Sequence, residues 1–569
     1  MEFDVTTLRG RRADSRLHRL SMGDIFERMR WSQPDRTVLT GHVGAAENPE
    51  GASVTVAEAD DRANQFANSL LAAGAQPGEI LVMVCENSLE SVLVKIGAAK
   101  AGVTIAPLNP NLAAEVMAEL IADMGARWAV VDAEFADRVR PVFDATNVNT
   151  LTSIAVGGPQ PDGAVSFADF IAAASTNEPD VTIHGDDIWQ IQFTSGTSAL
   201  PKGVMGSHSK TMFEALASVG IVTRGQRFEF DSVAGIFVSV TYHVSEVLIY
   251  AALLAGGRAV VGRRPDAREL AVAIDEHRVT TMHVGSPQML EHLDAELRAD
   301  PSLDAGTVTS ILHSFAPLRA ESYASVKDSI GADVLVVGVI GQTEMCIMHR
   351  FWIGADEDLH ARTSPQENYV GLPHPMTAAA IMGADGDIRK PGDAEVGGNA
   401  GVGEDGVGEG IYRSPALMAG YFNNPQATAE AFADGWFHGG DAFRSGEKGL
   451  RILNDRIKDV IKTGGENVSS IRVESVMSTH PLVNRAVAIG LPHPRWGEAV
   501  TVLVRTKPEA VVDEAALIGF AKTRLAGFET PKAVLFVDEF PETVGNKVKN
   551  HELRSQYAGL FDTAEAVSL

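Results

Sequence analysis

A repeated alternation of short apolar runs and helical stretches restricts this chain to an α/β fold. A helical stretch from Asp60 through Ala73 is followed by the apolar run 80–84, a second helical stretch over 88–101 and the run 103–106. Runs that are apolar at nearly every position are typical of parallel strands covered on both faces, and the helices between them make the crossovers. The rhythm returns in runs at 233–240, 259–261, 281–284 and 334–337. The pattern therefore predicts doubly wound parallel sheets, more than one of them.

The length and a shift in composition predict further parts. A chain of 569 residues is too long for one compact core. Between Gly383 and Gly410 the chain is rich in Gly, Asp and Glu, which predicts short strands joined by turns, a small β-barrel-like subdomain. After residue 458 the pattern indicates a small α+β module. Its expected helices lie near 471–479 and 513–525, and its expected strands lie at 483–491, 499–505 and 533–537.

Charge and cysteine content exclude some classes of partner and compartment. The formal net charge of -26 argues against nucleic acid and anionic membrane as partners. Cys85 and Cys346 are far apart and in no metal-ligand spacing, which favours a reducing, cytoplasmic location. The longest apolar stretch, 247–257, is too short to span a bilayer, so no membrane span is expected.

The stretch 194–203 carries the strongest chemical signal. It reads Thr-Ser-Gly-Thr-Ser-Ala-Leu-Pro-Lys-Gly, so hydroxyls and unhindered backbone N–H groups precede a lysine. It is not the phosphate loop of common ATPases, because Pro201 precedes Lys202 where that loop opens a helix with Gly-Lys-Ser/Thr. Alone it would be an ordinary turn, but with the motifs below it predicts a site for polyphosphate.

Four further motifs follow in a fixed order. They are Gly341-Gln342-Thr343-Glu344, the run 435–441, Asp455-Arg456-Ile457-Lys458-Asp459 and the run 541–547. With these residues the chain resembles the adenylate-forming superfamily, which includes acyl-CoA and aryl-CoA synthetases, luciferases and peptide-synthetase adenylation domains. The runs 412–418 and 421–425 make it most similar to bacterial fatty-acyl-CoA synthetases. The resemblance implies an N-terminal adenylation domain over 1–455, hinged to a mobile C-terminal domain over 456–569.

The resemblance also implies the reaction. The chain is expected to form an acyl-adenylate from a small-molecule carboxylic acid and ATP with Mg²⁺, releasing pyrophosphate, and then to transfer the acyl group to coenzyme A with release of AMP. An amine acceptor, as in amide-forming ligases, is one alternative. A non-catalytic nucleotide-binding relative is another, although the presence of both Lys202 and Lys547 argues against it. A homodimer is left open.

Individual roles carry over position by position. In the phosphate loop the resemblance assigns Thr194, Ser195, Gly196, Thr197 and Lys202 to the β- and γ-phosphates. Thr343 is assigned to the α-phosphate, Glu344 to Mg²⁺, Asp441 with Arg456 to the ribose, and Lys547 to the carboxylate and α-phosphate. The rest of the expected nucleotide site is Ala316, Pro317, Ile340, Gly341 and Gln342. The expected catalytic residues are Lys547, Glu344 and Thr194; the hinge residue is Lys458, and Gly464 and Gly465 border the pantetheine channel.

The expected acyl pocket departs from the family pattern. Ser314 and Phe315 replace a usual Gly-Gly before Ala-Pro, and His243-Val244-Ser245-Glu246 replaces His-x-x-Gly. Ile340 stands where an aromatic residue often does. We assign His243, Ser314 and Phe315 to this pocket, with Phe315 either shaping the acyl site or packing into the core.

Overall fold

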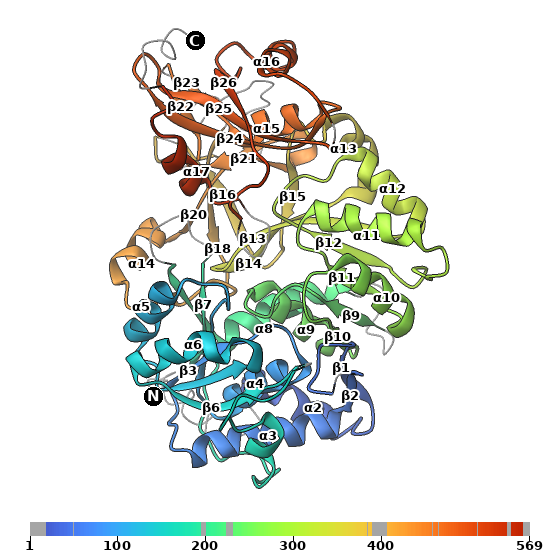
Figure 1. Cartoon of the computed structure of the whole chain (residues 1–569), viewed down its shortest axis with the longest axis vertical. Coiled ribbons are helices and arrows are strands. Elements are labelled where there is room, and N and C mark those ends of the chain that lie inside the picture. The colour runs from blue at the N-terminus through green and yellow to red at the C-terminus, as the bar shows by residue number, and fades with distance from the viewer. Residues whose placement is uncertain are drawn as a thin grey trace, which may run out of the picture.

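Two large sheets with helices on their faces make up most of the chain (Figure 1). The computed structural model describes residues 19–48, 50–156, 158–194, 201–222, 232–383, 385–389, 407–457, 459–464, 466–508, 510–542 and 548–561. Among these residues, no helix is both long and apolar enough to cross a membrane.

The first sheet has seven strands in the order β19-β8-β7-β4-β3-β5-β6. Its strands are β3 (Ile80–Val84), β4 (Thr104–Pro107), β5 (Trp128–Asp132), β6 (Asn149–Ile154), β7 (Ile188–Phe193), β8 (Gly203–Ser207) and β19 (Gly420–Tyr421). The strands from β3 to β7 are parallel, as the continuous apolar runs predict, and β8 returns antiparallel to β7. The accompanying helices are α3 (Val56–Ala72), α4 (Leu89–Lys100), α5 (Ala114–Met124), α6 (Ala133–Thr146) and α7 (Phe167–Ile171).

The second sheet has fourteen strands in the order β17-β16-β18-β20-β21-β15-β14-β13-β12-β11-β9-β10-β1-β2. Its central strands, from β13 to β1 in this order, are parallel, and the strands at both ends are antiparallel. Its strands are β1 (Thr37–Gly41), β2 (Ala52–Thr55), β9 (Val233–Ile236), β10 (Arg258–Val261), β11 (Thr281–His283), β12 (Ser310–His313), β13 (Leu335–Gln342), β14 (Met345–Trp352), β15 (Tyr369–Pro373), β16 (Ala378–Met382), β17 (Ile388–Arg389), β18 (Gly408–Arg413), β20 (Phe437–Ser445) and β21 (Arg451–Arg456). Strands β15, β16, β17, β18, β20 and β21 form the small β subdomain and continue the large sheet through β14. Most of the Gly-, Asp- and Glu-rich stretch at 383–410 that predicted it lies outside the described residues.

The other helices before the C-terminal module are α2 (Ile25–Arg30), α8 (His208–Val222), α9 (His243–Leu254), α10 (Ala267–His277), α11 (Pro287–Ala299), α12 (Ala320–Ile330), α13 (Glu357–Thr363) and α14 (Pro425–Ala431). Short 3₁₀ turns are η2 (Met22–Asp24), η3 (Ile353–Ala355), η4 (Ala433–Gly435) and η5 (Glu447–Gly449).

Helix α4 shows how the two sheets are joined. Its N-cap Ser88 accepts a hydrogen bond from the Ser91 amide, which fixes where the helix begins. All of its residues are buried, and the core around it includes Leu81 of β3 and Val261 of β10. One core therefore holds both sheets together.

The C-terminal module lies at the top of Figure 1. It contains β22 (Ile461–Thr463), β23 (Glu466–Val468), β24 (Val483–His493), β25 (Gly497–Thr506), β26 (Ala533–Phe536), α15 (Ser470–Ser478), α16 (Glu514–Lys522) and α17 (Asn550–Tyr557). The order is β23-β22-β25-β24, with β26 parallel to β25. The predicted α+β class is confirmed, whereas the division at 455/456, which falls at the end of β21, stays a prediction.

Candidate nucleotide and acyl site

The base of the predicted phosphate loop is a β-hairpin. The amide of Thr194 donates to the carbonyl oxygen of Lys202 at 3.0 Å, and the amide of Lys202 donates to Oγ1 of Thr194 at 3.2 Å. Strands β7 and β8 continue this pairing below the loop. Ser195, Gly196 and Thr197 lie outside the described residues. The two ends of the expected loop are therefore fixed side by side.

Lys202 connects to Glu344 through an aromatic ring. The Lys202 Nζ lies 4.6 Å from the centroid of the Tyr421 ring, and the Tyr421 hydroxyl donates to Oε1 of Glu344 at 2.7 Å. Burial and the adjacent Glu344 raise the pKa of Tyr421, so the phenol stays a donor. Two predicted site residues, 142 positions apart, are thus brought together by a residue to which the sequence assigned no role.

The Gly-Gln-Thr-Glu motif forms the hairpin between β13 and β14. Gln342 pairs with Met345, so Thr343 and Glu344 occupy the turn. A Cβ on Gly341 would lie 1.5 Å from the carbonyl oxygen of Cys346, so only glycine fits there. Ile340 is half-buried on β13. The motif thus holds Glu344 at the tip of a tight hairpin.

Asp441 is buried among donors from two other elements. It sits on β20 opposite Arg456 on β21, and Arg456 Nε lies 3.3 Å from its Oδ1. Gln342 Nε2 donates to Oδ2 of Asp441 at 2.8 Å and also to the Gly439 carbonyl. Three residues predicted for the nucleotide site therefore form one cluster around a carboxylate that is 4% exposed.

Glu409 on β18 is a neighbour of this cluster that the motifs missed. Its Oε1 accepts the Gly440 amide at 3.0 Å, and its Oε2 lies 2.9 Å from Nδ1 of His438. It therefore orders the backbone that leads into Asp441. Glu409 belongs to no motif, and only the pairing of β18 with β20 reveals the contact.

Phe315 adopts a backbone conformation that side chains usually avoid. Its φ is +71°, and its side chain is 56% exposed after β12. The alternative that Phe315 packs into the core is therefore wrong. The neighbouring Ser314 is fixed by its amide, which donates to the Gly285 carbonyl at 2.7 Å, and Ala316 and Pro317 are half-buried.

His243 lies in a buried network of charges. Its Nε2 contacts Glu214 and, at 2.9 Å, the Nζ of Lys210, while its Nδ1 lies 3.2 Å from Oε2 of Glu246. Glu246 also pairs with Lys95. Burial alone would raise the pKa of Glu214, but His243 and Lys210 outweigh it and hold that pKa below its ordinary value. All five side chains of this network are buried, and His243 is 5% exposed.

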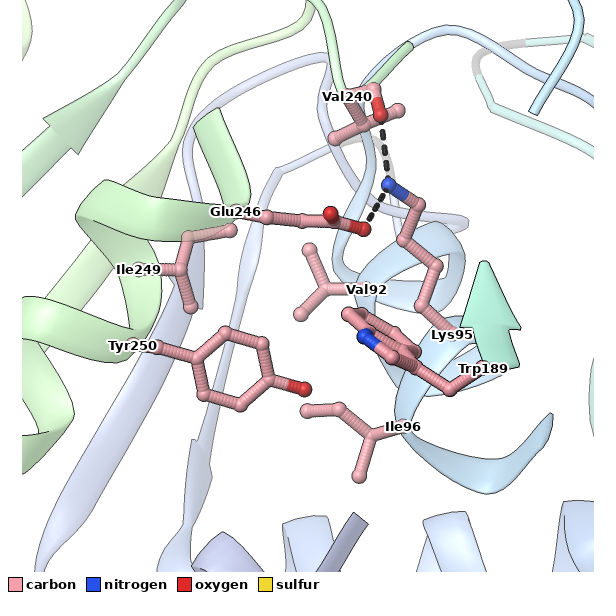
Figure 2. A pocket seen from close by; sticks show the side chains of 8 residues that line it. All are labelled: Val92, Lys95, Ile96, Trp189, Val240, Glu246, Ile249 and Tyr250. Carbon is pink, nitrogen blue, oxygen red and sulfur yellow. Dashed lines mark hydrogen bonds and ion pairs between the residues drawn. The ribbon is translucent and has the colours of Figure 1, made fainter. Parts of the chain in front are cut away.

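A small cavity borders this network between α4, α9 and β7 (Figure 2). The Lys95 amine lies between the Val240 carbonyl and Glu246, and Tyr250 and Trp189 form other parts of the wall. Its volume is about 10 Å³, at the lower limit for one water molecule. This cavity is too small for an acyl chain.

The remaining predicted residues belong to the C-terminal part. Gly464 has a φ of +62°, and its amide donates to the Trp496 carbonyl at 2.8 Å. Lys458, Gly465 and Lys547 lie outside the described residues. Their roles stay predictions.

Comparisons with known proteins find relatives that cover nearly the whole chain. The model of a family described as AMP-binding enzyme matches residues 26–422, and that of the AMP-binding enzyme C-terminal domain matches 472–547. A feruloyl-CoA synthase from Amycolatopsis is 28% identical over 89% of this chain and 94% of the relative. The long-chain-fatty-acid–CoA ligase FadD13 of Mycobacterium tuberculosis is 29% identical over 93% of this chain and 98% of the relative's chain. The crystal structure of ATP-bound MatB from Rhodopseudomonas palustris matches with a TM-score of 0.79 and 26% identity, covering 95% of this chain and 99% of that one.

Proposed function

This chain belongs to the AMP-binding enzyme family, and from that premise we propose that it is an AMP-forming acid–CoA ligase. In the first step a carboxylate oxygen attacks the α-phosphorus of ATP, and pyrophosphate leaves. In the second step the thiol sulfur of coenzyme A attacks the acyl carbon, loses its proton, and AMP leaves. Neither step needs a nucleophile from the protein, so catalysis depends on positioning and electrostatic stabilisation.

The cluster of Asp441, Arg456 and Gln342 carries this proposal. A buried carboxylate flanked by a guanidinium and an amide suits the two hydroxyls of a ribose, because a carboxylate accepts two hydrogen bonds at once. The likeness to an ATP-bound relative over nearly the whole chain supports the same assignment.

Glu344 is the residue proposed to hold Mg²⁺. Carboxylate and phosphate oxygens are the ligands this ion prefers, and the Glu344 carboxylate is oriented by the Tyr421 hydroxyl beside Lys202. The ion would offset negative charge on the phosphates. Lys202 would add a second positive charge at the same end of the nucleotide.

The proposal also covers the acyl acceptor and the class of carboxylic acid. By their names, the feruloyl-CoA synthase and the fatty-acid–CoA ligase both act with coenzyme A, which supports that acceptor here. For the acid we infer a compact molecule. Glu246 occupies the position where the family often has glycine, and the space behind it holds about one water molecule. We also infer a cytoplasmic location, because Cys85 and Cys346 are separate buried thiols.

A product analysis tests the whole proposal. The purified chain is incubated with ATP, Mg²⁺ and a graded panel of carboxylic acids, with coenzyme A in one set and amines in another, and products are identified by mass spectrometry. We expect AMP and an acyl-CoA thioester, formed best with short or compact acids. Amides without thioesters would overturn the acceptor, a preference for long chains would overturn the acid class, and no acid-dependent pyrophosphate would overturn the adenylation itself.

A further inference from the structure

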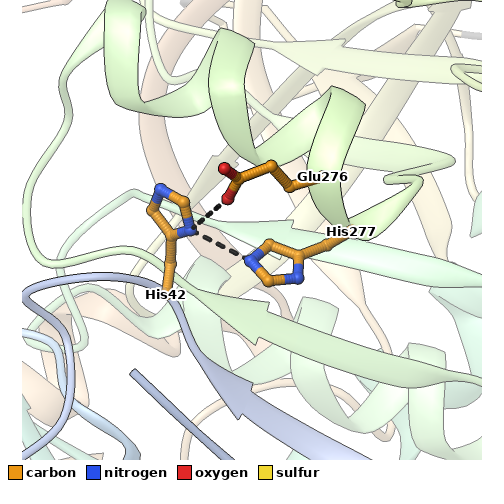
Figure 3. A group of neighbouring side chains, drawn as sticks. All are labelled: His42, Glu276 and His277. Atoms are coloured by element: carbon orange, nitrogen blue, oxygen red, sulfur yellow. Dashed lines mark hydrogen bonds and ion pairs between the residues drawn. The ribbon is translucent and has the colours of Figure 1, made fainter. Parts of the chain in front are cut away.

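A cluster of metal-ligating side chains lies at the other end of the large sheet from the nucleotide cluster. His42 follows β1, while Glu276 and His277 end α10 (Figure 3). In Figure 1, β1 and α10 lie at the lower right, away from β20 and β21. This cluster contains none of the residues assigned to the ligase reaction.

The donor atoms of this cluster converge. His42 Nδ1 lies 3.0 Å from His277 Nε2 and 3.9 Å from Oε2 of Glu276, and all three donor atoms fit within 4.8 Å of one another. Two nitrogens bound to one tetrahedral Zn²⁺ are roughly 3.4 Å apart. The histidine pair is therefore within a few tenths of an ångström of that geometry, and the exposed Glu276 side chain can adjust.

His42 is held in place by the fold. It is 2% exposed, its amide donates to the Val261 carbonyl at 2.8 Å, and its ring lies against Phe237. Its other nitrogen, Nε2, makes no hydrogen bond among the described residues, but a carboxylate oxygen of Glu269 lies 3.4 Å from it. A carboxylate behind a histidine is the usual outer contact of a metal-bound imidazole, because it keeps the proton on the far nitrogen.

Charged side chains from α10 and β10 surround the cluster. Glu269 and Glu276 add negative charge from α10, whereas Arg258 of β10 adds positive charge and donates to the His277 carbonyl. Imidazole nitrogens together with a carboxylate suit Zn²⁺, Ni²⁺ and Cu²⁺ much better than Mg²⁺.

We propose that His42, Glu276 and His277 form a site for one divalent transition-metal ion, which ties the end of β1 to the end of α10. Water supplies the remaining coordination. Glu269 is a positioning residue that acts through His42. The site is structural, and it is distinct from the Mg²⁺ proposed at Glu344.

Zinc binding to the metal-stripped full chain tests this proposal. Calorimetry is done with Zn²⁺ alone, without nucleotide, because ATP would compete for the ion. We expect one high-affinity ion per chain and a higher melting temperature with zinc. His277→Ala and Glu276→Gln should each weaken binding at least tenfold, and Glu269→Gln about tenfold. His292→Ala, which removes an exposed histidine of the neighbouring α11, should bind as wild type does.

Circular dichroism establishes that each variant is folded before zinc is added. These variants avoid the buried His42, whose loss would disturb packing. Wild-type affinity in folded His277→Ala, or no stoichiometric zinc binding by the wild type, would overturn the site. His42 and His277 would then be only a hydrogen-bonded pair. Either result leaves the ligase proposal untouched, since that is measured by products.

Discussion

At the scale of single residues, the Asp441 carboxylate offers the most direct test of nucleotide binding. Asp441→Asn keeps the size of the side chain but removes the charge that faces Arg456. Hydrogen bonds to a charged group contribute about 1.5–3 kcal/mol, so ATP and AMP should both bind roughly 10- to 100-fold more weakly. Calorimetry with each nucleotide measures the change.

The matched control for this variant is Asp434→Asn. Asp434 is an exposed residue of the same subdomain, in the turn η4 before β20, and its backbone φ of +51° is one that asparagine tolerates. The nucleotide affinity of the Asp434→Asn variant should stay at the wild-type value. Unchanged affinity in Asp441→Asn as well would mean that the ribose binds elsewhere.

Tyr421 makes a second prediction at this scale. Tyr421→Phe keeps the ring beside Lys202 and removes only the hydroxyl that donates to Glu344. If Glu344 holds Mg²⁺, losing this orienting hydrogen bond should weaken the response to Mg²⁺ about 10- to 100-fold. Pyrophosphate release at a series of Mg²⁺ concentrations measures it. The same Mg²⁺ dependence in variant and wild type would argue against Glu344 as the ligand.

Motifs predicted some contacts of the site and not others. Gln342, Asp441 and Arg456 each belong to a short conspicuous run, and they meet because β13, β20 and β21 deliver those runs to one place. Tyr421 begins the run 421–425, which carried the resemblance without giving this residue a role, and Glu409 belongs to no motif. Their partners lie 77 positions away in Glu344, and 29 and 31 positions away in His438 and Gly440, so only the tertiary pairing shows them.

At the scale of elements, the segment after β12 stores backbone strain at Phe315. A positive φ costs an ordinary residue roughly 1–2 kcal/mol, and glycine avoids that cost. Because the ring is 56% exposed, Phe315→Gly loses little apolar burial. It should therefore raise the free energy of unfolding by about 1 kcal/mol, measured by denaturant titration.

Phe315→Ala is the control, because it removes the ring and keeps the strain. It should show no such gain in stability. If the ring borders the acyl site, both variants should accept bulkier acids than the wild type does. A loss of several kcal/mol in either variant would mean that the ring contributes buried packing after all.

The apolar runs predicted strand boundaries well only where the strand ends at the same residue as the run. It predicted a strand over 233–240, but β9 ends at Ile236. Phe237 and Val240 are buried in the loop that leads to α9, and an apolar pattern does not distinguish a buried loop from a strand. The pairing of β15 with β21 could not be predicted either, because the paired residues are about 80 positions apart and no local pattern links them.

At the scale of the whole molecule, buried carboxyl groups lie where the C-terminal module meets β21. Asp455 Oδ2 accepts the amide of Ser470 at 2.6 Å and its hydroxyl at 2.8 Å, at the start of α15. The Ser469 hydroxyl donates to the Asn454 carbonyl, and Arg554 contacts Asp459. The contacts of Asn454 and Asp455 with Ser469 and Ser470 cross the predicted division at 455/456, so they would have to change if the module rotates between half-reactions.

Stability at this junction should depend on pH. Burial raises the pKa of Asp455 to about 7 from 3.8, and that of Glu474 on α15 to about 8 from 4.5. Between its unfolded and folded pKa values, each group holds a proton in the folded chain that the unfolded chain has lost. Stability therefore falls as pH rises through this interval. We expect α15 to open more readily at pH 8 than at pH 5.5, and Asp455→Asn, which stays neutral, should reduce that difference.

Hydrogen exchange of the first amides of α15, corrected for the intrinsic pH dependence of exchange, measures the opening. The matched control is Asp513→Asn, which changes the exposed N-cap of α16 in the same module. It should leave the pH response of α15 as in the wild type. If α15 protection instead rises with pH, the charged form of Asp455 is the stabilising one, and its hydrogen bonds from Ser470 outweigh the cost of its burial.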